Sequence, residues 1–341
     1  MLKKSFATVI GLAAAVSFLF SACDRKKLNI QSTTYVDDER DGAKIILGFS
    51  QIGTESSWRT ENTRSVFEAA AEQGIQVLYD DAQQKQTNQL KAIRSFIVYR
   101  VDVIAFVPIV EDGWDNVLRE AKEARIPVIV VDRKIKTQDE SLYAGFIGED
   151  GIEEGRKAAR FLLQKYSDST KKLNVLELRG TDYSSMAKER SAGFREVLLQ
   201  DPRFCIAKSV SGDFLRSRGK EIISNIFAKE GSLSWENSSL DIIFSHNDAM
   251  SLGALDTLQL YGVNAGRDVT IVSIDGEKDA VAALKEGKIN CIVECNPRLG
   301  PELIKLVKTA ANRNTIPRVT YVDGRVYSEN DDFSLTQAVG F

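Results

Sequence analysis

The chain has 341 residues, of which 27% are charged and 43% are hydrophobic, and its formal net charge is −3 at pH 7. This length allows two domains of ordinary size. Charges of both signs are interspersed along the chain, so no basic surface indicates nucleic-acid binding and we expect no nucleic-acid partner.

The histidine and cysteine content argues against a metal centre and a disulfide framework. The chain has one histidine, His246, and four cysteines, without the clustered spacing of a zinc site. Cys291 and Cys295 lie four residues apart in a predicted strand, roughly 13 Å apart by strand rise, which is too far for a disulfide between them. A disulfide from Cys205 to either one stays open. We expect no metal and no cofactor.

The N-terminal segment has the pattern of an export signal. Lys3 and Lys4 precede an apolar run over residues 6–20, and small residues follow directly before Cys23. The segment resembles the bacterial lipoprotein signal, in which this cysteine is lipidated, although Phe20 stands where Leu is commonest. An ordinary signal peptide cut nearby is the alternative. We expect a signal peptide at residues 1–22 and a lipidated Cys23 with a polar, flexible tether at residues 23–42; loss of both lysines makes the net charge −5.

From Ala43 onward, short β-rich runs alternate with amphipathic helical segments, which predicts parallel sheets built from right-handed βαβ units. The predicted strands are 44–50, 76–79, 103–107 and 128–131, and the helices between them are 65–73, 88–99 and 114–124. After Gly148 the alternation begins again, with helices 151–166, 187–199, 217–228, 249–260 and 299–311 and strands 173–178, 205–210, 240–244, 269–274 and 289–294. The sequence therefore predicts an α/β protein with two doubly wound, Rossmann-like parallel-sheet lobes.

The run from Pro127 to Lys134 carries the strongest single signal for a site. Its β-branched residues predict a strand buried on both faces, and Asp132 and Arg133 follow directly. Open α/β sheets bind ligands at the carboxyl ends of their strands. A carboxylate accepts hydrogen bonds and a guanidinium donates several in a fixed fork, so the pair suits a polyhydroxylated molecule. A salt bridge at the end of a strand is the alternative interpretation.

Polar and aromatic side chains recur at the corresponding positions after the other strands. Each of them also has an explanation as a helix cap or turn residue, but their recurrence favours a binding site in a cleft between the two lobes. Trp58 is expected just before the first helix, where its indole can stack on a sugar ring. The candidate ligand-binding residues are Glu55, Trp58, Arg59, Asp132, Arg133, Ser185, Lys188, Phe214, Asn247, Asp275 and Glu294.

Several of these residues stand in longer motifs: Val131-Asp132-Arg133, Ala187-Lys188-Glu189-Arg190, Gly212-Asp213-Phe214, His246-Asn247-Asp248 and Ile274-Asp275-Gly276. In this order the motifs resemble the ribose-type periplasmic sugar-binding proteins, which have the type 1 periplasmic-binding-protein fold. A second set of motifs consists of Gly48-Phe49-Ser50-Gln51, Glu55-Ser56-Ser57-Trp58-Arg59, Gln83-Gln84-Lys85-Gln86, Ser211-Gly212-Asp213-Phe214 and Ser273-Ile274-Asp275-Gly276. This second set resembles the galactofuranose-binding members of the family, which are the most similar, and the resemblance covers nearly all of residues 44–311. Lys188 stands where many ribose-type relatives have Arg, and Ser57-Trp58 stands where they have two Phe residues, which argues against ribose as the ligand.

The resemblance implies two lobes joined by three hinge strands. We expect an N-terminal lobe at 43–148 plus 296–325 and a C-terminal lobe at 149–295 plus 326–341, with crossings near Gly148, near Asn296 and near Gly324–Val326. It implies that the lobes close on a monosaccharide, galactofuranose or a related sugar.

The resemblance also implies a role in transport. The expected function is the substrate-binding protein of an ABC-type sugar importer, which delivers its sugar to a membrane permease. We expect an exported monomer in the periplasm or on the outer face of the cytoplasmic membrane, anchored by a lipid on Cys23.

Two alternatives stand beside the importer. The first is a sensor that reports its sugar to a chemoreceptor or kinase. The second is a sugar-modifying enzyme with Asp132 and Asp275 as acid and base, which is disfavoured because the flanking Arg133 makes Asp132 unsuited to donate a proton. We therefore expect no catalytic residue. The export signal argues against a transcriptional regulator.

Overall fold

A computed structural model describes residues 44–333 and 340–341. The predicted signal peptide, the lipidation at Cys23 and the tether lie outside the described residues. Within them, no helix combines the length and the apolar character needed to cross a membrane.

The first of two large sheets, sheet A, is entirely parallel. Its inner strands are runs of Val, Ile and Phe buried on both faces, as the sequence predicts for a parallel sheet. The strand order is β13-β5-β4-β3-β1-β2. The strands are β1 (Ile46–Gln51), β2 (Gln76–Asp81), β3 (Val103–Phe106), β4 (Val128–Val131), β5 (Gly145–Gly148) and β13 (Val319–Tyr321).

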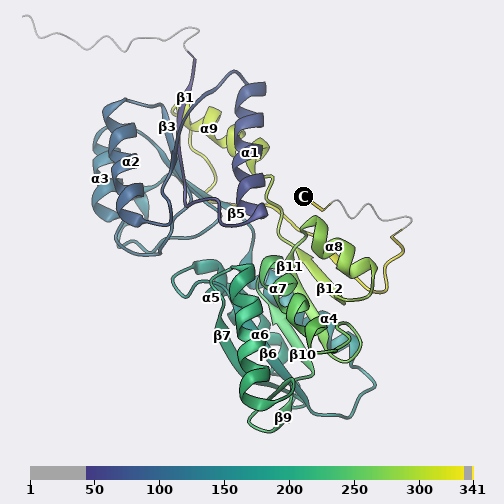
Figure 1. Cartoon of the computed structure of the whole chain (residues 1–341). Coiled ribbons are helices and arrows are strands. Elements are labelled where there is room, and N and C mark those ends of the chain that lie inside the picture. The colour runs from purple at the N-terminus through teal and green to yellow at the C-terminus, as the bar shows by residue number, and fades with distance from the viewer. Residues whose placement is uncertain (1–43, 334–339) are drawn as a thin grey trace, which may run out of the picture. The chain divides into compact units, whose positions relative to one another are not determined.

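Helices cover both faces of sheet A (Figure 1). On one face, α1 (Ser57–Glu72) and α9 (Gly300–Ala311) bury apolar residues such as Val66 and Leu303 against the strands. On the other face, α2 (Gln86–Val98) and α3 (Asp115–Glu123) form a second core, and the short η1 (Glu140–Leu142) adds Leu142 to it. We call sheet A with these helices the first lobe.

The second large sheet, sheet B, repeats this architecture with the order β14-β12-β11-β10-β6-β7. Five of its strands run parallel, and β14 pairs antiparallel with β12 at one edge. A small hairpin, β8 (Ser234–Trp235) with β9 (Ser238–Ser239), stands apart from it. The strands of sheet B are β6 (Leu173–Arg179), β7 (Phe204–Ser211), β10 (Ile242–Ser245), β11 (Thr270–Asp275), β12 (Cys291–Glu294) and β14 (Val326–Ser328).

Sheet B is likewise covered on both faces. Helices α4 (Gly151–Lys165) and α5 (Ser185–Leu198) pack on one face. Helices α6 (Arg216–Glu230), α7 (Asp248–Leu260) and α8 (Lys278–Lys285) form the core on the other. We call this unit the second lobe. The prediction of two doubly wound parallel-sheet lobes is confirmed.

The chain passes between the two sheets three times within the described residues: after β5, after β12 and between β13 and β14. The β14 strand is antiparallel because it follows β13 without an intervening helix. Most predicted boundaries agree with the structure within two residues. The first helix was predicted too short: it begins at Ser57 rather than Ser65, because Ser56 caps it by accepting a hydrogen bond from the Arg59 backbone N–H at 3.2 Å.

Candidate functional site

A pocket lies where the carboxyl ends of strands from both sheets meet, the position at which open α/β sheets bind ligands. It encloses an empty volume of about 360 Å³, part of which is open solvent. The lining combines charged, amide, aromatic and thioether side chains. They are Glu55, Ser56, Trp58, Arg59, Asp132 and Arg133 from the first lobe, and Met186, Phe214, Asn247 and Asp275 from the second.

The first lobe contributes a cluster of two carboxylates and two guanidinium groups. Asp132 and Arg133 follow β4, whereas Glu55 and Arg59 lie on either side of the start of α1. Arg59 Nη1 donates to Asp132 Oδ2 at 2.8 Å, and Arg59 Nε donates to Glu55 Oε1 at 3.4 Å. The charges of these acids raise the pKa of Arg59, although its burial opposes them. Arg59 is therefore a fixed cation that orients both acids.

Arg133 is held differently. Its Nε lies 3.9 Å from Asp132 Oδ2, beyond hydrogen-bond distance, and its guanidinium lies over the Phe214 ring at 5.4 Å. Burial, together with the like charge of Arg59, lowers the pKa of Arg133 to about 10. Arg133 therefore stays charged near neutral pH, and its donors remain available to a ligand.

The second lobe contributes an amide, an acid and a ring. Asn247 is the N-cap of α7: its Oδ1 accepts from the Met250 backbone N–H at 3.1 Å, and its Nδ2 donates to the Phe214 carbonyl at 3.0 Å. A Cβ on Gly180 would lie 1.9 Å from the Phe214 ring, so a glycine is needed there for the ring to reach the pocket. Asn247 thus fixes the loop that carries Phe214.

Three pocket residues have positive φ angles, which are rare for residues other than glycine. The φ angles are 63° for Asp132, 62° for Phe214 and 130° for Asp275. Such conformations each cost about 1–3 kcal/mol and persist where the surroundings impose them, commonly at functional sites. Their coincidence in one pocket supports a functional role for it.

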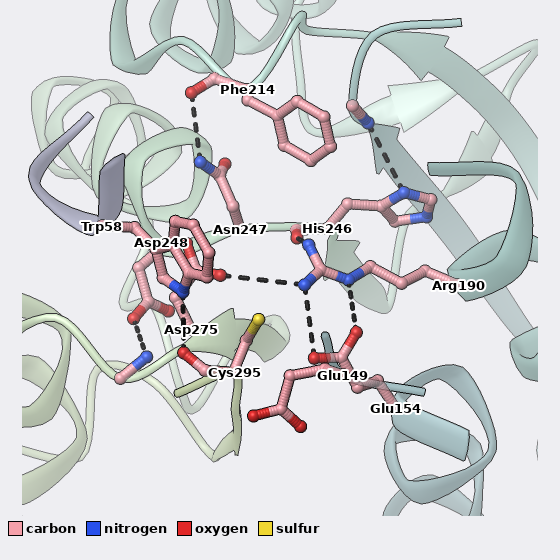
Figure 2. A network of polar contacts seen from close by, with 12 residues as sticks. Trp58, Glu149, Glu154, Arg190, Phe214, His246, Asn247, Asp248, Asp275 and Cys295 are labelled. Carbon is pink, nitrogen blue, oxygen red and sulfur yellow. Dashed lines mark hydrogen bonds and ion pairs between the residues drawn. The ribbon is translucent and has the colours of Figure 1, made fainter. Parts of the chain in front are cut away.

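Arg190 lies behind the second-lobe side of the pocket (Figure 2). It donates from Nε to Glu154 Oε2 at 2.7 Å and from Nη1 to the His246 carbonyl at 2.5 Å, and Nη2 lies 3.9 Å from Asp275 Oδ1. The negative charges of Glu154 and its neighbours raise the pKa of Arg190 despite its burial. Burial also raises the pKa of Asp275, and the charge of Arg190 counteracts this. Arg190 thus supports the backbone before Asn247 and the carboxylate of Asp275 from behind.

The comparisons with known proteins agree with this architecture. A family model described as periplasmic binding protein domain matches residues 47–315. The chain belongs to this family.

Curated and solved members of the family are similar over most of their length. The galactofuranose-binding protein YtfQ of Escherichia coli K12 is 37% identical over 84% of this chain and 88% of its own. A Mycobacterium smegmatis protein solved in complex with β-D-fucofuranose is 42% identical, with a TM-score of 0.79 over 84% of this chain and 91% of that one. The arabinose ABC-transporter binding protein of Shewanella sp. ANA-3, solved with α- and β-L-arabinofuranose, is 38% identical, with a TM-score of 0.78 over 83% and 92%.

In this periplasmic binding protein, Trp58 lies in the first turn of α1 rather than before the helix. It lines the pocket and donates from its indole N–H to the Cys295 carbonyl at 2.8 Å. One turn further along α1, Asn62 Nδ2 donates to the Pro297 carbonyl at 2.9 Å. The indole is therefore fixed at its edge by the segment that leads from β12 to α9.

Three of the predicted ligand-binding residues lie outside the pocket lining. Ser185 Oγ accepts from the Lys134 backbone N–H at 2.8 Å, Lys188 pairs with Glu111, and Glu294 Oε2 accepts from the Arg325 backbone N–H at 2.9 Å. The other eight predicted residues do line it.

Ser56, Met186 and Arg190 were not among the candidate ligand-binding residues, although Ser56 and Arg190 stand in motifs that carry the resemblance. For Arg190 a usable signal existed, since its spacing from Ala187 and Phe194 places it on the buried face of α5.

His246 is a core residue. Its Nδ1 accepts from the Gly180 backbone N–H at 3.4 Å, and Nε2 lies 3.3 Å from Glu177 Oε1. Burial lowers the pKa of His246. Hydrogen bonds from His246, Ser191 and Ser209 lower the pKa of Glu177 to about 2, although burial opposes them. The arrangement anchors β10, which leads to Asn247.

The described residues contain no group of three or more His, Cys, Asp or Glu side chains that could hold a metal ion. Cys205, Cys291 and Cys295 are free thiols in the structure, so neither disulfide left open by the sequence forms.

Proposed function

We propose that this protein is the extracytoplasmic substrate-binding protein of an ABC-type sugar importer and that its ligand is a monosaccharide in the furanose form, such as galactofuranose. The observation that carries the proposal is the pocket in which Asp132 and Arg133 of the first lobe meet Asn247 and Asp275 of the second. Relatives at 37–42% identity that are named for, or solved with, galactofuranose, fucofuranose and arabinofuranose support a furanose ligand.

Seven of the ten lining residues have a role suited to a polyhydroxylated ring. The carboxylates of Glu55, Asp132 and Asp275 accept hydrogen bonds from sugar hydroxyls, and Arg133 donates to them. Asn247 can both donate and accept, because its two bonds within the protein leave one N–H and one lone pair of the side-chain amide free. Trp58 and Phe214 offer apolar surface to the C–H faces of the ring.

Binding would proceed by closure of the lobes about a three-strand hinge. We propose lobe boundaries at 43–148 plus 296–325 and at 149–295 plus 326–341, which agree with the three passages of the chain between the sheets. A sugar that contacts both lobes binds the closed arrangement more tightly and shifts the equilibrium towards it. The permease would then recognise the closed form.

Export and anchoring complete the proposal. A signal peptide at residues 1–22 and a lipid on Cys23 would hold a monomeric protein at the membrane surface, with residues 24–42 as the tether. Replacement of Cys23 by Ala should release the protein from the membrane fraction and abolish metabolic labelling with a palmitate analogue. Labelling that persists in this variant would rule out Cys23 as the anchor.

The binding proposal is tested by calorimetry and thermal shift with ring-locked sugars. Methyl galactofuranosides, fucofuranosides and arabinofuranosides would be compared with the corresponding pyranosides and with ribose. We expect furanosides to raise the melting temperature in proportion to their concentration, by mass action, and pyranosides to do so weakly or not at all. Asp132→Ala and Arg133→Ala should lose the effect, and Asp112→Ala, an exposed acid in the loop after β3, should retain it.

Each unfavourable result has its own meaning. A preference for pyranosides would overturn the furanose assignment. Unchanged affinity in both pocket variants would leave Asp132 and Arg133 as a strand-end salt bridge. Turnover of a sugar would point to an enzyme, a role for which we propose no catalytic residue.

A further inference from the structure

Helix α5 of the second lobe contacts two loops of the first lobe through three polar interactions outside the pocket lining. Lys188 forms an ion pair with Glu111, which follows β3. Glu189 Oε1 accepts from Lys134 Nζ at 2.8 Å, and Ser185 Oγ accepts from the Lys134 backbone N–H at 2.8 Å, in the loop after β4. All three α5 residues lie within its first five positions, so they form one patch on the first turns of the helix.

The first-lobe partners are fixed within their own lobe. The Glu111 carbonyl accepts from the Lys136 backbone N–H at 2.8 Å, and its carboxylate lies 3.5 Å from Lys136 Nζ. Lys134 Nζ also donates to the Tyr321 hydroxyl at 3.2 Å. Because Glu111 and Lys134 are already oriented within the first lobe, these two side chains lose little further entropy when they pair with α5.

Ser185 and Lys188 are two of the eleven residues that the sequence suggested for direct ligand contact. Neither lines the pocket, and Lys188 is exposed. Their partners belong to the opposite lobe, so the bonds can exist only when the two lobes approach each other at α5.

We propose that Glu111 and Lys134 of the first lobe, with Ser185, Lys188 and Glu189 of α5, form a latch that sets the open–closed equilibrium of the protein without touching the sugar. This α5 latch rests on the proposed binding function and adds positioning residues to it. It stabilises the closed arrangement by the same amount whichever sugar occupies the pocket.

The latch makes a specific thermodynamic prediction. When only a small fraction of the sugar-free protein is closed, the apparent Kd equals the intrinsic Kd divided by that fraction. Removal of a latch contact lowers the closed fraction, so every sugar binds more weakly by the same factor. A residue that contacts the sugar would change the ratio of affinities between two sugars that differ at one hydroxyl.

The test compares the latch variants Lys188→Met, Glu111→Gln and Glu189→Gln with Glu196→Gln. Glu196 is also on α5, but it pairs with Arg156 Nη2 at 2.9 Å within the second lobe, so it is a matched control. We expect about two- to fivefold weaker binding in each latch variant, the range for partly exposed ion pairs, and no change in the control. The ratio of Kd values for a galactofuranoside and an arabinofuranoside should stay constant.

A double-mutant cycle sharpens the result. Lys188→Met combined with Glu111→Gln should weaken binding no more than the more severe single variant, because both remove the same contact. Added salt should reduce the difference from the wild type. Full additivity of the two single effects, a changed ratio between the sugars, or unchanged affinity in all three variants would overturn the latch.

A measurement without sugar separates this proposal from the proposed function. A spin label at Asp112→Cys, in a Cys205→Ser background, should broaden the amide signals of α5 in the sugar-free protein through its minor closed population. We expect Lys188→Met to reduce this paramagnetic relaxation enhancement and Glu196→Gln to leave it unchanged. This result can be obtained even if no sugar binds; equal enhancement in both variants would refute the latch and leave the sugar proposal intact.

Discussion

The two sides of the pocket hold their polar groups in different ways. On the first-lobe side, Arg59 pairs with Asp132 inside the pocket itself, so charges that face the ligand neutralise one another. On the second-lobe side, Asn247 and Asp275 face the pocket while their supporting cation, Arg190, lies behind them outside its lining. The first side is stabilised by its own members, whereas the second depends on a buried network.

Because of this difference, substitutions on the two sides of the pocket should affect different properties, ligand affinity on one side and the free energy of unfolding on the other. Substitutions of the first-lobe acids should act mainly on affinity, because Arg59 has two acid partners, Glu55 and Asp132, and keeps one of them when the other is replaced. Substitutions in the buried network around Arg190 should act mainly on the free energy of unfolding, because they leave buried charges without their partners.

The largest effect is expected for Arg190→Met. It would leave the buried Glu154 carboxylate without its cation and remove two further contacts, so the free energy of unfolding should fall by about 3–5 kcal/mol. Urea denaturation measures this fall. Arg156→Met, which breaks a pair with the exposed Glu196, serves as the control and should cost less than about 1 kcal/mol. Equal losses in the two variants would contradict a special role for Arg190.

Asp132→Asn tests the opposite side. Asn tolerates the positive φ at this position, so folding should be little affected. Loss of one charge-assisted acceptor should weaken sugar binding about 10- to 100-fold, as measured by calorimetry. If stability fell instead and affinity held, the contrast between the two sides would be wrong.

A smaller, pH-dependent effect is expected for Glu149→Gln. Burial and the charge of Glu154 raise the pKa of Glu149 to about 9, although the Asn296 backbone N–H, at 2.8 Å, and the charges of Lys157 and Arg190 oppose this. The folded protein then keeps a proton that the unfolded chain releases above about pH 4.5, so stability falls as the pH rises from about 4.5 to 9.

The Gln variant should remove this dependence and be about 1–2 kcal/mol more stable than the wild type at pH 8, with no gain at pH 4.5. Thermal or urea unfolding across this range measures it. Glu196→Gln should show no such difference in stability between pH 4.5 and pH 8. If Glu149→Gln were less stable than the wild type at pH 8, the pKa of Glu149 would not be raised in the folded protein.

The smallest effect is expected for Trp58→Phe, which keeps an apolar plate in the pocket but removes the donor to the Cys295 carbonyl. The loss of one buried hydrogen bond should lower the free energy of unfolding by about 1 kcal/mol and weaken binding less than Asp132→Asn does. A larger loss of affinity than of stability would show that the indole itself, rather than its anchorage, contributes most.

The fold could be predicted from the sequence where one signal dominates. The Val and Ile runs of β4 and β11 identify buried parallel strands, and the polar residues directly after them mark the pocket edge. The three expected crossings between the lobes came from the resemblance to sugar-binding proteins rather than from the residue pattern.

Other features depend on tertiary contacts that no local pattern reports. The first turns of α1 are polar because Arg59 and Asn62 are buried against partners far along the chain. The short strands β13 and β14 have three residues each and form only by pairing at sheet edges. Lys188 and Arg190 are two residues apart on one helix, and only packing decides that Arg190 faces inwards and Lys188 the opposite lobe.

The two α1 bonds described above have a mechanical consequence. Trp58 and Asn62 lie one turn apart on the same helix, and they grip the Cys295 and Pro297 carbonyls on either side of the proposed crossing at Asn296. Helix α1 therefore links the pocket-lining indole directly to the segment at residues 295–297. We therefore expect a ligand that displaces the indole to displace residues 295–297 as well, through these two hydrogen bonds in addition to the packing of α1 on sheet A.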